Sequence, residues 1–159
     1  MAISPVGDAP TDPELVDDFL VAAALQQLHR IRHYIEQVGL HPDCTRVGKP
    51  TALCYASLKP NITLVEYYLE KGADVNQADA IGMTPLHYAA MGGCVMCLAR
   101  LIAAGARINT RNRCGETPLA AAVYRAHCRE TAELLQRHGA VIGSKSAAGD
   151  PEHGVPRFH

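Results

Sequence analysis

The sequence predicts an all-α solenoid of about four helix–turn–helix units joined by hairpin loops, and two recurring stretches carry this prediction. The first, Gly82-Met-Thr-Pro-Leu-His-Tyr-Ala-Ala90, returns further along as Gly115-Glu-Thr-Pro-Leu-Ala-Ala-Ala122. The second, Gly72-Ala-Asp-Val-Asn76, returns at the same offset as Gly105-Ala-Arg-Ile-Asn109 and then, one position late, as Gly139-Ala-Val-Ile-Gly143. A fixed period, here about 33 residues, is typical of stacked structural units that share one core.

Within one unit the pattern predicts a short helix, a turn, a second helix and a loop. Thr84 can cap the first helix, and Pro85 suits its first helical position. Gly92-Gly93 interrupts the chain, and an apolar stripe then predicts a second helix with one buried face. Gly105 ends that helix where a left-handed residue is commonly needed, and the polar segment 107–115 is expected to form a hairpin-like loop. The apolar stripe of the second helix consists of Cys97, Leu98, Leu101 and Ile102.

Counting the period forwards and backwards divides the chain into an array and two tails. We expect units at about 13–46, 47–79, 80–112 and 113–142, with disordered tails at 1–12 and 143–159. The first unit keeps only the skeleton of the pattern, as expected of an N-terminal cap. In the last unit Ala120 replaces His87, and one residue is inserted near Arg125-Ala-His127.

The Thr-Pro-Leu-His-x-Ala-Ala stretch and the later Gly-Ala-Asp-Val-Asn stretch, repeated at this period, resemble the ankyrin repeat. The resemblance implies a helical array that binds proteins through its loop tips and the exposed side of the first helices, which together form a concave face. It also implies that His87 has a structural role and hydrogen-bonds to the backbone of the neighbouring loop.

Composition excludes several classes of function. The 15 basic and 16 acidic residues leave a net charge of −1, whereas binding to phosphates requires a net basic face, so we expect no nucleic-acid partner. No apolar run approaches the roughly 18 residues of a membrane span, and Met1 to Pro10 lack the pattern of a secretory signal. We therefore expect a cytoplasmic or nuclear protein with no membrane contact, in which the six cysteines are reduced thiols.

Cys94-Val-Met-Cys97 is the strongest candidate for chemistry in the chain. A redox pair or a zinc site are alternatives, but no second pair of cysteines stands at ligand spacing, and Cys97 falls on an apolar stripe. The favoured interpretation is core packing, because buried free cysteine behaves as a small hydrophobe. No phosphate-binding loop, nucleophile elbow or metalloprotease motif occurs. We expect no metal, no cofactor and no enzymatic activity.

The resemblance also assigns a partner-binding face and two modifiable residues. In this sequence the family's binding positions are Val47, Leu58, Lys59, Ile81, Met83, Met91, Arg113, Cys114, Glu116, Tyr124 and Arg125. Several are apolar, and Tyr, Met and Arg are enriched at interface cores. Asn76 and Asn109 stand where the family has loop-tying asparagines, and the resemblance permits hydroxylation of both by an oxygen-dependent asparaginyl hydroxylase.

These observations predict a protein that binds another protein and that is monomeric by itself. The favoured function is an adaptor or a stoichiometric inhibitor. The alternatives are a host-directed effector and a substrate-recruiting subunit of a ubiquitin-ligase or signalling complex.

Overall fold

A computed structural model describes residues 12–126 and 128–143 of the chain, and no β-strand occurs among them. The predicted tails at 1–12 and 143–159 lie outside this part except for Asp12 and Gly143. The helices are α1 (Pro13–Ala24), α2 (Leu28–Arg32) continued by η1 (His33–Gln37), α3 (Ala52–Leu58), α4 (Ile62–Glu70), α5 (Pro85–Gly92), α6 (Val95–Ala103), α7 (Pro118–Ala121) continued by η2 (Ala122–Ala126), and α8 (Arg129–Arg137).

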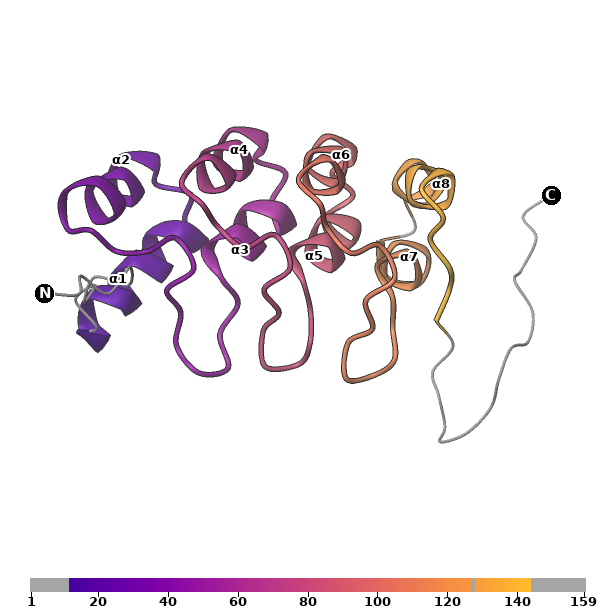
Figure 1. Cartoon of the computed structure of the whole chain (residues 1–159), viewed down its shortest axis with the longest axis horizontal. Helices are drawn as coiled ribbons and strands as arrows, with labels where there is room; N and C mark the ends of the chain where they lie inside the picture. The colour runs from indigo at the N-terminus through magenta and orange to yellow at the C-terminus, as the bar shows by residue number, and fades with distance from the viewer. Residues whose placement is uncertain (1–11, 127, 144–159) are drawn as a thin grey trace, which may run out of the picture.

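The helices stack in two parallel rows along the molecule (Figure 1). We call α1, α3, α5 and α7 the inner helices and α2, α4, α6 and α8 the outer helices. Long loops leave the inner row on the side away from the outer helices and run side by side (Figure 1). The all-α repeat array predicted from the sequence period is therefore confirmed. Among the described residues, no helix is long and apolar enough to cross a membrane.

The starts of the inner helices follow the capping chemistry of the sequence. Thr51, Thr84 and Thr117 occupy the N-cap positions of α3, α5 and α7 in extended conformation. The hydroxyl of Thr117 accepts a hydrogen bond from the Ala120 backbone N–H at 3.3 Å, which satisfies one of the orphan donors of the helix. Proline follows the cap in α5 and α7, where its missing N–H costs nothing.

The ends of the outer helices depend on glycine. Gly72, Gly105 and Gly139 follow α4, α6 and α8 with φ of 88°, 93° and 82°. This left-handed conformation turns the chain from the outer helix into the next loop, and a Cβ atom would disfavour it. The glycine anchor of the sequence repeat is thus a backbone requirement.

The residue inserted in the last unit is accommodated inside its inner helix. Residues Ala122–Ala126 form the π-helical segment η2 directly after α7. A π-turn takes one residue more than an α-turn, so the insertion widens one turn and leaves the next helix in place. Arg129 then starts α8 in the outer row as its counterparts do.

Small residues set the spacing between successive inner helices. Ala56, Ala89 and Ala122 are fully buried at equivalent positions, so α3, α5 and α7 approach closely. At Gly92 a Cβ atom would lie 2.3 Å from the Leu58 carbonyl oxygen, so the end of α5 touches the backbone of α3 directly. Larger apolar side chains fill the space between the two rows of helices. Large buried apolar side chains include Phe19, Ile31, Leu53, Tyr68, Leu86, Leu98 and Leu119.

His87 links one unit to the loop of the next. Its ring is fully buried, and Nδ1 accepts a hydrogen bond from the Thr84 backbone N–H at 3.2 Å. Since a backbone N–H can only donate, the ring proton sits on Nε2, which donates to the Glu116 carbonyl oxygen at 3.0 Å. The structural role expected for His87 agrees with this geometry, because neither ring nitrogen is left for chemistry.

We predict that His87→Ala destabilises the array by about 2–3 kcal/mol, because it opens a cavity and removes the hydrogen bonds of the ring to the Thr84 N–H and the Glu116 carbonyl. Urea unfolding followed by circular dichroism measures this loss. Ala120, the equivalent residue in the last unit, is the natural comparison, and Ala120→Gly should cost less, about 1 kcal/mol. Equal stability of wild type and His87→Ala would contradict the linking role.

Burial lowers the pKa of His87 below its ordinary value of 6.5. Between the folded and the unfolded pKa only the unfolded chain binds the proton, so the stabilisation is complete above about pH 6.5 and is lost as the pH falls towards the folded pKa. We predict that the difference in free energy of unfolding between wild type and His87→Ala shrinks from about pH 7.5 to about pH 5, by at most about 1.4 kcal/mol per pH unit. A difference independent of pH would contradict the burial of a neutral ring.

Candidate protein-binding face

One residue in each unit forms an apolar row along the inner helices. Leu25, Leu58, Met91 and Tyr124 follow one another at the period of the repeat. Each stands at or near the C-terminal end of its inner helix or, for Tyr124, within η2. Leu25 and Tyr124 are 58% and 59% exposed, while Leu58 and Met91 are half-buried between them. We call these four residues the apolar row.

The loop tips carry a second set of exposed side chains. Val47 is fully exposed at the tip of the first loop, and Ile81 is 55% exposed at the second. Arg113 and Cys114 are exposed at the third, where the Arg113 N–H donates to the Ile81 carbonyl oxygen at 2.9 Å. The second and third tips are therefore tied together by backbone, and their side chains are left facing solvent.

Met83 is buried, contrary to its predicted place on the binding face. Only 2% of its surface is exposed, and its sulfur accepts a hydrogen bond from the Asn112 side-chain amide at 3.1 Å. The carboxylate of Asp79 accepts the N–H groups of both Ile81 and Met83, which folds the loop so that the two side chains part. Sequence position alone does not reveal this choice, because both residues stand in the same loop.

Three other predicted contact residues, Lys59, Glu116 and Arg125, already make polar contacts within the array. The Arg125 guanidinium pairs with the Glu116 carboxylate at 2.8 Å, and that carboxylate also accepts from the Asn112 amide at 3.1 Å. The Lys59 ammonium donates to the Ala24 carbonyl oxygen at 3.0 Å, across the boundary between the first two inner helices. These charges hold neighbouring elements together and line the apolar row at the same time.

Sequence reasoning missed Leu25. A signal for it existed, because three repeat periods back from Tyr124 arrive at Leu25. The first unit matches the repeat so loosely that this equivalence is easily overlooked. Outside this face, Met96 is 64% exposed on the outer helix α6.

Asn76 and Asn109 use their side chains to tie each loop to the next unit. The Asn76 amide oxygen accepts from the Arg107 N–H at 2.8 Å and its nitrogen donates to the Gly105 carbonyl at 3.3 Å. Asn109 makes the same pair of bonds to Val141 and Gly139, at 2.9 and 3.1 Å. Hydroxylation of these two asparagines stays a prediction.

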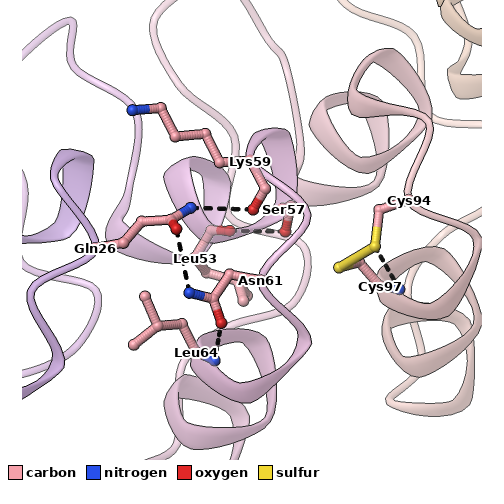
Figure 2. Close-up of a disulfide and its surroundings, with 8 residues drawn as sticks. All are labelled: Gln26, Leu53, Ser57, Lys59, Asn61, Leu64, Cys94 and Cys97. Carbon is pink, nitrogen blue, oxygen red and sulfur yellow. Dashed lines mark hydrogen bonds between the residues drawn. A yellow bond between two sulfur atoms is a disulfide. The ribbon is translucent and has the colours of Figure 1, made fainter.

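The Cys94 and Cys97 sulfurs are joined in a disulfide at the start of α6 (Figure 2), whereas the sequence predicts reduced thiols. The difference has a geometric cause: Cys94 is the N-cap residue, so its sulfur turns towards the first turn of the helix, where Cys97 lies. Among the described residues, no three His, Cys, Asp or Glu side chains gather as a metal site would need.

The remaining cysteines differ in reactivity. Burial raises the pKa of Cys44 to about 11 and that of Cys54 to about 12. Hydrogen bonds from the side chain and the backbone of Thr131 lower the pKa of Cys128, which occupies the N-cap position of α8. Cys114 is exposed at a loop tip.

Comparison with known proteins identifies the repeat. A family model described as ankyrin repeats in three copies matches residues 19–112 and 53–146. A fem-1 homologue of Drosophila melanogaster is 38% identical over 100 residues, which are 61% of this chain and 15% of that protein. The E3 ubiquitin-protein ligase Ufd4 of the same organism is 38% identical over 112 residues, 69% of this chain and 4% of that protein.

A smaller relative shares a shorter segment. Human ankyrin repeat domain-containing protein 37 is 45% identical over 51 residues, which are 32% of this chain and 32% of that protein. The chain thus spans a third or less of each of these relatives.

We predict that a maleimide reagent at neutral pH labels Cys114 and Cys128 first in the native protein. Cys114 is exposed, and Cys128 is half-buried with a lowered pKa, whereas the high pKa and burial of Cys54 keep its thiol protonated and shielded until the array unfolds. Peptide mapping after short labelling measures the order, with Cys114→Ser and Cys128→Ser as controls that each remove one label. Early labelling of Cys54 would contradict the predicted order.

Proposed function

The chain belongs to the ankyrin-repeat family, and from this premise we propose that it is a non-catalytic adaptor or stoichiometric inhibitor that holds a partner protein on its inner face. Ankyrin repeats indicate a protein–protein interaction module, and the family is generally non-catalytic. The partner's identity and the residues that bind it belong to the proposal.

The apolar row is the observation that carries the proposal. Leu25 and Tyr124 expose large apolar surfaces at the two ends of the row, and Leu58 and Met91 continue it between them. Isolated exposed apolar residues are ordinary, but one at the same position of every unit gives a continuous line over the face. A partner that covers this line would bury apolar area in each unit.

Charged residues beside the row favour a protein partner with polar groups at its edge. Lys59 lies next to Leu58, and Arg125 lies next to Tyr124; both are exposed. Arg113 adds a further cation at the neighbouring loop tip. Apolar residues together with Tyr and Arg are the usual composition of an interface core and of its hot spots. The proposed contact set is therefore the apolar row together with Val47, Ile81 and Arg113.

A second candidate function is substrate recruitment to a ubiquitin ligase. The observation that favours it is the match to the segment of Ufd4, a protein named as an E3 ubiquitin-protein ligase. The match spans 4% of Ufd4, so it covers only a short segment of that protein.

We predict that Leu25→Glu/Tyr124→Glu loses a specific partner captured by the wild type from cell lysate under reducing conditions. Each substitution places a charge in the proposed contact, and removal of a hot spot typically costs about 2 kcal/mol or more, so capture should fall by at least about tenfold. Quantitative mass spectrometry of the captured proteins measures the change, and ligase subunits among the lost proteins would favour the second candidate.

Met96→Glu is the matched control, because Met96 is equally exposed but lies on an outer helix. Circular dichroism must first show equal helicity for all three proteins. If capture survives in the double variant and is lost in Met96→Glu, the outer helices bind the partner and the proposal for the inner face is wrong.

A further inference from the structure

The outer helices α4 and α6 begin at equivalent positions of the repeat, and only α6 has a cysteine pair there. Helix α4 begins at Asn61, whose amide oxygen accepts a hydrogen bond from the Leu64 N–H at 3.1 Å. Helix α6 begins at Cys94, whose sulfur accepts a hydrogen bond from the Cys97 N–H, also at 3.1 Å. Figure 2 shows the two caps in neighbouring units. Asparagine and leucine cap and pack the helix in one unit, so capping and packing do not require two thiols at the same positions in the next.

The two cysteine residues differ in their exposure to solvent. Cys94 is 8% exposed at the turn between α5 and α6, whereas Cys97 is completely buried among the apolar side chains of the core. Gly92 and Gly93 precede Cys94, so no side chain of the turn itself covers its sulfur. A reagent that reaches the pair therefore meets Cys94 first, and Cys97 can react only with Cys94.

The same backbone also accommodates the reduced, dithiol form of the cysteine pair. In the dithiol form the Cys94 sulfur stays at the N-cap of a nine-residue helix. Helix N-termini favour negative charge, and the Cys97 N–H is already directed at this sulfur. A thiolate at Cys94 is thus stabilised by groups that the disulfide form also uses, so both redox states fit the same backbone.

We propose that Cys94 and Cys97 form a reversible dithiol–disulfide site that exchanges with low-molecular-weight disulfides of the glutathione class. In the forward direction the Cys94 thiolate attacks one sulfur of glutathione disulfide, forming a mixed disulfide and releasing one glutathione thiolate. Cys97 then loses its proton to solvent and attacks the Cys94 sulfur, which releases the second glutathione. The cysteine pair loses two electrons, glutathione disulfide gains them, and the two thiolates released take up protons at neutral pH.

The site lies close to the proposed contact surface. Met91 of the apolar row stands shortly before Cys94 in the chain, and the Gly92 backbone touches Leu58 of the neighbouring unit. The Cys128 sulfur lies 3.5 Å from the position that a Cβ atom on Gly93 would take, so the next outer helix also borders this turn. Cys128 is therefore the thiol whose participation the experiment has to exclude.

We predict that the wild-type chain changes from six to four alkylatable thiols as the fraction of glutathione disulfide rises, and returns to six when reduced glutathione is added. After equilibration the protein is quenched, unfolded in denaturant, alkylated and weighed intact. Unfolding before alkylation makes the buried Cys54 count equally. Peptide mapping is expected to find Cys94 and Cys97 as the pair that escapes alkylation.

The matched control is Cys94→Asn/Cys97→Leu, which copies the cap of α4 and should fold with four alkylatable thiols in every mixture. Cys128→Ser should change from five to three. A wild-type count that stays at six in all mixtures would overturn the proposal, and so would a count that stays at four in excess reduced glutathione. A mapped pair that includes Cys128 would overturn the assignment to Cys94 and Cys97 even if the control variant fails to fold.

Discussion

The close approach of successive inner helices is the constraint on which the rest of the array depends. Buried alanines at equivalent positions, together with the backbone contact between Gly92 and Leu58, hold neighbouring units at a short and constant distance. No single unit has enough apolar surface to form a core, so each helix pair is stable because its neighbours cover it. The spacing therefore decides which side chains of adjacent units can reach one another.

At this spacing, polar side chains can link one unit to the next. His87 reaches the Glu116 carbonyl, and Asn76 and Asn109 each reach two backbone groups of the following unit. These bonds satisfy backbone groups in loops that contain no helix or strand of their own. They also anchor the loops of successive units to one another, including the loop that carries the exposed Ile81.

The same repetition that builds the core produces the candidate binding face. Because every unit follows the one before it at a constant period, a side chain outside the core recurs as a line along the molecule, as Leu25, Leu58, Met91 and Tyr124 do. Positions that the core does not use are free to vary, and here they carry apolar residues bordered by Lys59 and Arg125. The cysteine pair stands at another recurring position, the start of an outer helix, where Asn61 provides the cap in the unit before it.

The sequence by itself determined the all-α repeat, the period, the capping threonines and the glycines that end the outer helices, because these signals act on the backbone within a few residues. It also indicated three members of the apolar row. Only the tertiary structure decided that Met83 turns inward while Ile81 turns outward, that Arg125 pairs with Glu116, and that Cys94 and Cys97 are joined. The burial of Met83 depends on a contact with Asn112, almost a full repeat away in the chain. The other two pairings depend on the directions in which loop, helix and cap residues turn their side chains. Neither property follows from the order of residues within one repeat.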